Sequence, residues 1–488
     1  MTTSSQSAAP ALIGRKAEQA ELLDAAKSGR PELIAVYGRR RIGKTHLIRT
    51  FFAKQICFEL TGVREARAGQ QLKNFAHTLE SATKFKLRAP RDWPEAFQEL
   101  IRYLDQQLRT EGRKVVFLDE VPWLAGRRSG FLPAFEYFWN SWGSRQAGLI
   151  VVICGSAASW MITKVLHQKG GLHNRITRNI PLQPFCLPEA EEFLKSRGVA
   201  LDRKQVIELV MAVGGVAYYL DYARKGRSAA QIIESLFFAP NAPLLDEFGK
   251  LFAALFENHQ RHLKVIRALA RKQAGLSRKE LIEVTRFETG GNLTTILDEL
   301  EASGFICRMV PFGHTKRDPI YRLIDELTLF HLRWVEGKRD TSGNDGRWSR
   351  IRSTPAWHAW SGYAFENLCL KHVDGIKKSL GISGVQTECA SWRHRPSDPD
   401  DTGAQIDLLI DRKDGVINVC EMKFSEGEFC IDKAYARDLR NKLDVFRRVT
   451  GTRKSLFLTL VTTFGISDNT YQAELVQNSL TAESLFER

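Results

Sequence analysis

Eight consecutive residues near the start of this 488-residue sequence have the types and spacing of a phosphate-binding loop. They are Gly38, Arg39, Arg40, Arg41, Ile42, Gly43, Lys44 and Thr45. The two glycines let backbone N–H groups close around an anion, the lysine ammonium reaches terminal phosphates, and the threonine hydroxyl suits Mg²⁺. A glycine-rich structural turn is the alternative. The pattern predicts that ATP and Mg²⁺ bind at these residues.

The segments on either side of this loop favour the phosphate-binding interpretation. An apolar run with β-branched residues precedes it at 33–37, and a segment with helical apolar spacing follows it at 46–52. A strand that enters the loop and a helix that leaves it are the context that such a motif requires. The positive end of that helix would face the same anion.

A second apolar run ends in two acidic residues, Asp119 and Glu120. Parallel strands that are buried on both faces have such runs, and open α/β sheets bind ligands beyond the carboxyl ends of their strands. We therefore expect Asp119 to orient Mg²⁺ and Glu120 to polarise the attacking water. A strand that ends in a solvated acidic turn is the alternative.

A third apolar run, 149–154, ends at Gly155 and Ser156, and we predict that Ser156 senses the terminal phosphate of the nucleotide. Further on, Arg175 and Arg178 precede another expected strand. In an oligomeric ATPase, one of these arginines could reach a neighbouring subunit's nucleotide as an arginine finger. An ordinary surface charge is the alternative for each.

A second group of chemically capable residues lies near the C-terminus. The segments 405–411 and 416–424 alternate as strands and are joined by a turn at 412–415, which predicts a hairpin. Alternation places Glu421 and Lys423 on one face, and pairing brings Asp407 beside them. With Glu366 from a preceding helix, the carboxylates could bind Mg²⁺ and the lysine could orient or deprotonate water. A cross-strand salt bridge is the alternative.

Residues 258–335 predict three helices and a β-hairpin, the arrangement of a winged helix. The third helix would place Asn292, Thr294 and Thr295 near base edges, and the hairpin loop would place Lys316 and Arg317 on phosphate. The same helix also carries three acidic residues, Asp298, Glu299 and Glu301. A rigid spacer or a protein contact therefore remains the alternative to DNA binding.

The composition is that of a folded protein with a polyanionic partner. Hydrophobic residues make up 43% and charged residues 26%, and 71 Lys and Arg against 56 Asp and Glu give a net charge of +15. Such a balance favours nucleic acid, although a basic solvated surface is the alternative. Eight scattered cysteines predict buried free thiols in a reducing compartment. No signal peptide or membrane-spanning run is expected, which predicts a cytoplasmic protein.

The length predicts several domains. We expect a disordered tail at 1–11 and an α/β P-loop ATPase core at 12–186. A helical lid would follow at 187–257, a winged helix at 258–335 and a linker at 336–350. An α/β domain at 351–488 would complete the chain.

Five stretches together resemble the archaeal-type P-loop ATPases of the STAND/AAA+ class. They are GRRRIGKT, VVFLDE, ICGS, the arginine-rich approach to PLQPF, and GGVAYYL, in which Ala217 stands where that family usually has proline. The resemblance extends to the C-terminal D…E-x-K arrangement, the core of the PD-(D/E)xK (restriction-endonuclease-like) fold. It implies an ATPase whose nucleotide state controls a metal-dependent nuclease acting on DNA, and an arginine-finger homo-oligomer. An ATP-driven switch or DNA-binding scaffold that does not cleave is the competing interpretation.

Overall fold

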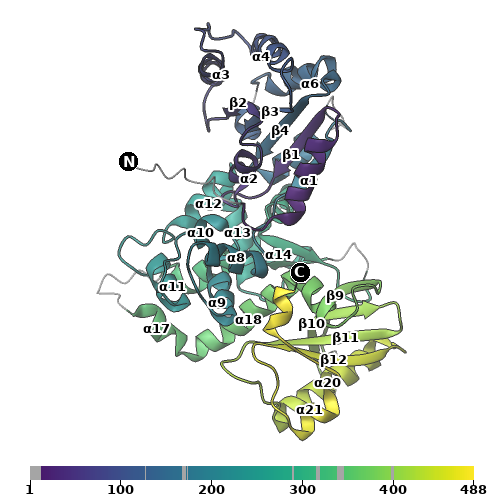
Figure 1. Ribbon diagram of the computed structural model, residues 1–488. Coiled ribbons are helices and arrows are strands. Elements are labelled where there is room, and N and C mark those ends of the chain that lie inside the picture. The colour runs from purple at the N-terminus through teal and green to yellow at the C-terminus, as the bar shows by residue number, and fades with distance from the viewer. Residues whose placement is uncertain are drawn as a thin grey trace, which may run out of the picture. The chain divides into compact units, whose positions relative to one another are not determined.

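The computed structural model describes residues 12–126, 128–166, 172, 174–287, 291–314, 319–337, 346–396 and 401–487. The chain divides into two compact units, Met1–Pro184 and Phe185–Arg488 (Figure 1). Three predicted features lie outside the described residues: the tail at 1–11, Lys316 and Arg317 of the predicted wing, and residues 338–345 of the predicted linker.

A five-stranded parallel sheet forms the centre of the first unit. Its strands lie in the order β2 (Ile56–Thr61), β3 (Lys114–Asp119), β4 (Leu149–Gly155), β1 (Glu32–Tyr37) and β5 (Arg178–Pro181). Every residue of β1 and β4 is buried, which explains why both segments are apolar almost throughout. The three predicted apolar runs are therefore neighbouring strands, and β4 lies between β1 and β3.

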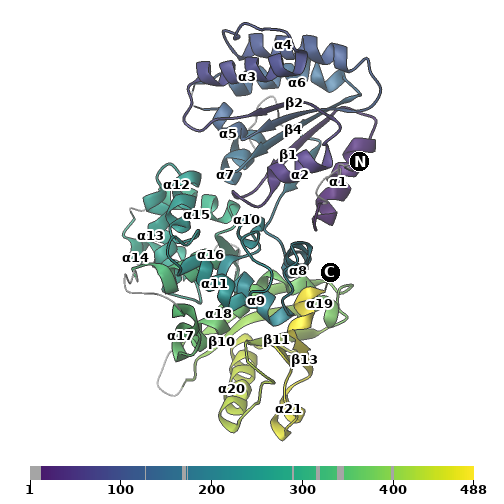
Figure 2. The same ribbon diagram turned by 60° about the vertical axis from the view of Figure 1, so that its left-hand side comes forward.

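Helices α3 (Ala68–Thr83), α4 (Trp93–Gln107) and α6 (Phe131–Ser141) lie together beside this sheet (Figure 2). Edge-to-face aromatic contacts join them, with ring centroids 6.2 Å apart for Phe75 and Trp93 and 4.8 Å apart for Trp93 and Phe131. Such pairs stabilise a core beyond the area that they bury. The remaining helical segments of this unit are α1 (Lys16–Lys27), α2 (Lys44–Phe51), α5 (Val121–Leu124), η1 (Gly143–Arg145), α7 (Ala158–Trp160) and η2 (Met161–Leu166).

The second unit begins with five helices, in agreement with the helical periodicity of this part of the sequence. At its start Gly215 lies against Phe185, so closely that a Cβ atom would come within 1.8 Å of the Phe185 carbonyl oxygen. Only glycine fits there, since real Cβ atoms do not approach so near. The helices are α8 (Leu187–Ser196), α9 (Arg203–Val213), α10 (Ala217–Leu220), α11 (Ala229–Phe237) and α12 (Glu247–Leu255).

Three helices and a small antiparallel sheet follow. The helices are α13 (His259–Ala270), α14 (Arg278–Thr285) and α15 (Gly291–Ala302). The sheet has the order β6 (Leu276–Ser277), β8 (Ile320–Leu323) and β7 (Ile306–Met309). The sequence predicts only the β7–β8 hairpin, because two residues are too few to show an alternating pattern.

The C-terminal part contains a five-stranded mixed sheet in the order β13 (Asn478–Thr481), β12 (Ser455–Thr462), β11 (Val416–Lys423), β10 (Ala404–Arg412) and β9 (Thr387–His394). The strands β9, β10 and β11 pair antiparallel, whereas β11, β12 and β13 pair parallel. The predicted hairpin is therefore present. The other helical segments are α16 (Glu326–Phe330), η3 (His331–Val335), α17 (Arg347–Arg352), α18 (Pro355–Lys371), α19 (Val373–Ser379), α20 (Lys433–Thr450), α21 (Thr470–Leu475) and η4 (Ala482–Phe486).

The end of the predicted linker is helical in the structure. Residues 347–352 form α17, and Trp348 is fully buried there. Its backbone N–H donates to the Glu234 carboxylate of α11 at 2.6 Å. Polar and glycine-rich composition indicates an exposed segment, but it cannot show that a tryptophan inside that segment packs against a distant helix.

All eight cysteines are free, but the expectation that they are buried is only partly right. Cys154, Cys369 and Cys420 are buried, whereas Cys389 and Cys430 are exposed. Among the described residues, no helix combines the length and the apolar character needed to cross a membrane.

Candidate functional site

The predicted phosphate-binding loop connects β1 to α2 and has the backbone shape that its glycines allow. Gly43 has a φ of +96°, and Gly38 has a φ of +149°. A Cβ atom at position 38 would also come within 2.2 Å of the Leu182 carbonyl oxygen, so this position accepts only glycine. The close approach of β5's end to the loop therefore depends on the first glycine of the motif.

Lys44 and Thr45 lie at the start of α2 and face the ends of the neighbouring strands. The buried Lys44 ammonium donates to the carbonyl oxygens of Gly38 and Arg39, both at 2.9 Å, and to the Ser156 hydroxyl at 3.2 Å. The Thr45 hydroxyl donates to Asp119 at 2.7 Å. The structure thus brings the predicted lysine, threonine, acid and sensor residues together.

Glu120 and Ser156 are hydrogen-bonded to each other. The Glu120 carboxylate accepts from the Ser156 backbone N–H at 3.1 Å and also from the Ser156 hydroxyl. Glu120 has a φ of +50°, an unusual backbone conformation for a residue that is not glycine, and such outliers are frequent at functional sites. Because β4 lies between β1 and β3, its carboxyl end connects the loop lysine to the predicted water-activating acid.

The sequence interpretation misses one residue that supports the loop. The buried Arg15 guanidinium donates to the carbonyl oxygen of Ile42 at 3.1 Å and to that of Gln183 at 2.5 Å. It therefore ties the loop to the segment that follows β5. No motif marks Arg15, because its partners lie 27 and 168 residues further along the chain.

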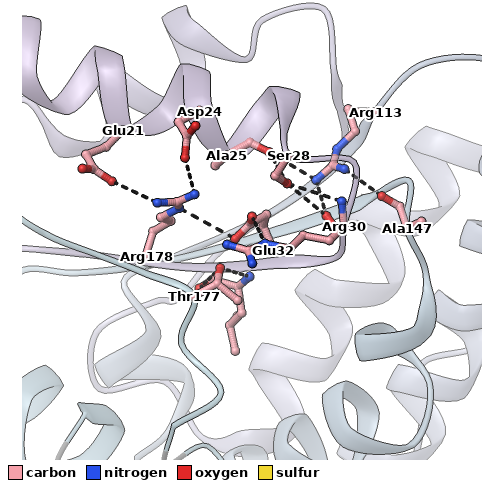
Figure 3. Close-up of polar contacts among 11 residues, drawn as sticks. Glu21, Asp24, Ala25, Ser28, Arg30, Glu32, Arg113, Ala147, Thr177 and Arg178 are labelled. Carbon is pink, nitrogen blue, oxygen red and sulfur yellow. Dashed lines mark hydrogen bonds and ion pairs between the residues drawn. The ribbon is translucent and has the colours of Figure 1, made fainter.

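Arg178 lies away from the nucleotide loop of its own chain, and its predicted role as an arginine finger for a neighbouring subunit stays a prediction. It begins β5 opposite Ile34 of β1, whereas the loop follows the other end of β1. Its guanidinium pairs with Glu21 and Asp24 of α1, and its Nε lies 4.0 Å from the fully buried Glu32 carboxylate (Figure 3). Arg175 is exposed, and its proposed role as an arginine finger stays a prediction.

Replacing Arg178 with alanine should lower stability more than catalysis. The fully buried Glu32 carboxylate would lose a cationic neighbour. Because Glu21 and Asp24 are exposed, their ion pairs with Arg178 contribute little, and we expect the free energy of unfolding to fall by about 1–2 kcal/mol. Burial alone would raise the pKa of Glu32, but polar contacts to Thr177, Ser28 and Arg30 lower it. Glu32 therefore stabilises the fold at neutral pH, and this contribution disappears as the pH falls through the lowered pKa.

The measurement is the midpoint of thermal unfolding, together with ATP turnover at 25 °C. Arg109→Ala is the matched control, since it removes an exposed arginine just beyond the end of α4. If Arg178→Ala leaves stability unchanged and lowers ATP turnover to an extent that depends on protein concentration, the result would contradict the structural role. It would support the role of Arg178 as an arginine finger.

The predicted C-terminal residues come from three elements of the second unit. Glu366 lies on α18, Asp407 on β10, and Glu421 and Lys423 on β11. Leu408 pairs with Cys420, so continuing that register by one residue places Asp407 opposite Glu421. Burial, together with the neighbouring Asp407 carboxylate, raises the pKa of Glu366 to about 7. Burial is the main cause of this shift, and the crowding of the Asp407 carboxylate beside Glu366 adds to it.

Cationic residues that the sequence interpretation misses neutralise this crowding. Arg322 of β8 is buried, and its guanidinium lies 3.3 Å from Glu366 and 3.9 Å from Asp407. Lys442 of α20 pairs with Glu421, which also accepts from the Tyr435 hydroxyl at 3.1 Å. No local motif marks these partners, because each is brought in from a different element.

The three carboxylates are therefore not arranged here as the predicted metal site. In the described part of the chain, no group of three or more His, Cys, Asp or Glu side chains is placed to hold a metal ion. The role of Glu366, Asp407 and Glu421 as ligands of Mg²⁺ stays a prediction. Lys423 lies 4.0 Å from Glu421, so a carboxylate–lysine contact is present as well.

The third helix of the predicted winged helix, α15, has an exposed polar face. Asn292, Thr294 and Thr295 are exposed on it. The three acidic residues of α15, whose charge would oppose DNA binding, have partners within the second unit. Arg308 of β7 lies 2.9 Å from both Asp298 and Glu301, and His262 of α13 lies 2.7 Å from Glu299.

The parallel sheet, the glycine loop and the Lys44, Thr45, Asp119 and Glu120 side chains define a P-loop ATPase. Residues 12–223 match the family model of an ATPase domain found predominantly in Archaea. Residues 12–223 therefore form an ATPase domain of this archaeal type.

Other known proteins are similar to most of the chain. An uncharacterized protein of Methanocaldococcus jannaschii, MJECL04, is 22% identical over 434 residues, which cover 88% of this chain and 91% of that protein. The Walker-type ATPase paby2304 of Pyrococcus abyssi matches 66% of this chain and 96% of its own, with 20% identity and a TM-score of 0.48. The Aeropyrum pernix ORC2 protein, solved as ADPNP and ADP complexes, matches 67% and 95%, with 15% identity and a TM-score of 0.44.

Proposed function

We propose that this protein is an ATP-hydrolysing enzyme whose nucleotide state controls a metal-dependent nuclease acting on DNA. The observation that carries the nuclease proposal is that Asp407, Glu421 and Lys423 lie on adjacent strands of the mixed sheet, while Glu366 of α18 shares the Arg322 guanidinium with Asp407. Carboxylates beside a lysine on adjacent antiparallel strands suit the cleavage of phosphodiesters. The ATPase part rests on the phosphate-binding loop, on Asp119 at the end of β3 and on Glu120 just after it.

Magnesium fits the ATPase site, because Thr45 and Asp119 present neighbouring oxygen atoms, the donors that this ion prefers. Bound there, it would neutralise charge on the β- and γ-phosphates. Glu120 would orient and polarise the attacking water, and Lys44 would hold the terminal phosphates. Ser156 contacts both Lys44 and Glu120, so it would sense the nucleotide from between them.

The C-terminal carboxylates have suitable donor atoms for a divalent ion, but their present partners compete with one. Arg322 and Lys442 contribute the positive charge that a metal would otherwise supply. We therefore propose that the cleaving state requires Arg322 to leave Glu366 and Asp407. Because Arg322 belongs to β8, a shift of the small three-stranded sheet would accomplish this.

DNA is the proposed substrate because the net charge is +15 and the exposed face of α15 carries Asn292, Thr294 and Thr295. These side chains suit base edges if α15 enters a major groove as the third helix of a winged helix. The guanidinium of Arg308 offsets part of the negative charge of Asp298 and Glu301 that would oppose such binding. A contact between this helix and a protein remains the alternative.

Asp407→Asn should lower Mg²⁺- or Mn²⁺-dependent cleavage by at least about tenfold, because it removes a charged ligand and leaves the shape of the side chain. The assay compares linear, circular and single-stranded DNA, with and without ATP. Lys44→Ala tests whether ATP controls cleavage. Asp414→Asn, in the exposed turn between β10 and β11, is the matched control.

Arg322→Met tests the competing positive charge directly. The substitution removes the guanidinium charge and keeps much of the side-chain volume. Cleavage that rises in Arg322→Met and is lost again in the Arg322→Met, Asp407→Asn double variant would support a latent nuclease. If neither the unmodified protein nor Arg322→Met cuts any substrate, the second candidate holds: an ATP-driven switch or DNA-binding scaffold. The pairing of the carboxylates with Arg322 and Lys442 favours that candidate.

A further inference from the structure

A run of cationic residues covers the helix α13 and the start of α14. Residues 258–279 contain seven Lys and Arg and no Asp or Glu, in a chain whose net charge is +15. The segment comprises α13, the short strand β6 and the first two residues of α14. Its positive charge therefore equals nearly half of the net charge of the whole protein.

Two of these seven cations are neutralised by acids. Arg267 pairs with Glu336 at 2.7 Å, and Lys272 pairs with Glu280 at 2.6 Å. The other five are exposed, and no carboxylate in the described part of the chain lies within ion-pair distance of them. We call these five residues the basic surface: Arg261, Lys264, Arg271, Arg278 and Lys279.

The cations of the basic surface that belong to α13 lie along the helix. Lys264 and Arg271, the residue that ends α13, are seven residues apart, close to two helical turns, so they share one side. Arg261 lies one turn before Lys264. At a rise of about 1.5 Å per residue, the three positions are spread over about 15 Å.

The start of α14 extends this row. The helices α13 and α14 lie side by side (Figures 1 and 2). The ion pair between Lys272 and Glu280 joins the end of α13 to the first turn of α14. Arg278 and Lys279 precede Glu280 in that turn, so the basic surface continues from one helix to the next.

The cations stand at places where local stability favours acids. Lys264, Arg267 and Arg271 follow one another at spacings of four residues or fewer, where like charges repel. Arg278 and Lys279 are the first two residues of α14, and the N-terminal end of a helix carries partial positive charge. Residues that break local rules in this way are typical of functional surfaces.

The spacing of the basic surface restricts the kind of anion that fits. A small anion needs cations that converge on one point, whereas these are spread along two helices. A helix that binds an anionic membrane exposes Trp, Phe or Leu beside its cations, but Leu263, Ile266 and Leu269 of α13 are buried. Duplex nucleic acid presents a rigid row of phosphates, with one charge for about every 1.7 Å of its axis.

We propose that the basic surface binds the phosphate backbone of duplex DNA. This inference rests on DNA as the partner in the proposed function, but it depends neither on cleavage nor on base contacts by α15. Phosphate contacts provide affinity that is independent of sequence, whereas contacts to base edges provide specificity. The basic surface would therefore hold duplexes of any sequence.

The test measures binding of the full-length protein to fluorescent DNA duplexes over a range of salt concentrations, without divalent ions. The variant combines Arg261→Gln, Lys264→Gln and Arg271→Gln, since glutamine removes the charge and keeps a similar helix propensity. Each lost phosphate contact reduces the slope of log affinity against log salt by about 0.9. We expect a slope smaller by about 2 to 3 and at least about tenfold weaker binding at low salt, for duplexes of unrelated sequence.

A second triple variant is the matched control. It combines Lys73→Gln, Arg88→Gln and Arg109→Gln, which remove the same types and number of exposed cations from the first unit. The control should keep the slope of the unmodified protein. The variant of the basic surface should unfold at no lower temperature than the unmodified protein, because it loses repulsion between like charges. A lower unfolding temperature would assign these cations a structural role instead.

Three binding results would overturn the inference. An unchanged slope in the variant of the basic surface, while the unmodified protein binds DNA, would refute the basic surface and leave the DNA partner in place. The absence of salt-dependent binding to any duplex would refute the DNA partner as well. Binding to phosphatidylglycerol vesicles but not to DNA, abolished by the three substitutions, would assign the basic surface to a membrane.

Discussion

ATP turnover by the Lys44→Ala protein should fall at least about 100-fold below that of the unmodified chain. The Lys44 ammonium is buried within the loop and is held by the carbonyl oxygens of Gly38 and Arg39 and by the Ser156 hydroxyl. The ammonium is therefore already in position before ATP binds. It can stabilise negative charge on the transferred phosphate without a costly rearrangement of the loop. Alanine removes this charge, so ATP binding should weaken as well.

The measurement is steady-state phosphate release together with equilibrium binding of ATP. Lys54→Ala is the matched control, because Lys54 is an exposed lysine just beyond the end of α2. A thermal unfolding profile like that of the unmodified protein would show that the loop variant is folded. Turnover within a factor of a few of the control would contradict the assignment of Lys44.

Glu120→Gln should slow hydrolysis by at least about 100-fold while ATP affinity stays close to that of the unmodified protein. Glutamine keeps the length of the side chain, and its amide oxygen can still accept from the Ser156 backbone N–H. It lacks the negative charge that polarises water. The variant should therefore hold ATP in its site without converting it.

Single-turnover hydrolysis after ATP binding separates the chemical step from binding. Glu111→Gln provides the same chemical change at an exposed position just before the other end of β3. If Glu120→Gln binds ATP and hydrolyses it as fast as the Glu111→Gln control, another group activates the water. Loss of ATP binding would instead show that the Glu120–Ser156 contact maintains the shape of the site.

The sequence predicts the ATPase site well because its parts are local. The loop occupies eight consecutive residues between one strand and one helix, and Asp119 and Glu120 end another strand. Apolar runs reveal buried parallel strands, and parallel strands place their carboxyl ends at one edge. The sequence pattern therefore predicts that Thr45 and Asp119 lie close together.

The sequence predicts the C-terminal region less completely. Alternation and the turn at 412–415 indicate the β10–β11 hairpin, and the hairpin places Asp407 near Glu421. The cations that pair with these acids have no such signal. Arg322 lies 44 residues before Glu366 and reaches it only because β8 packs against the C-terminal part.

The sequence by itself determined the phosphate-binding loop, the acidic strand end and the hairpin that carries Asp407 and Glu421. Motif chemistry and the periodicity of buried side chains depend on neighbours along the chain, so both can be read without coordinates. Only the tertiary structure decided that Arg178 pairs with acids of α1 and lies beside Glu32 at the start of β1, and that Arg322 pairs with Glu366 and Asp407. Ion pairs of this kind depend on which elements pack together, and periodicity shows which face is buried but not what covers it.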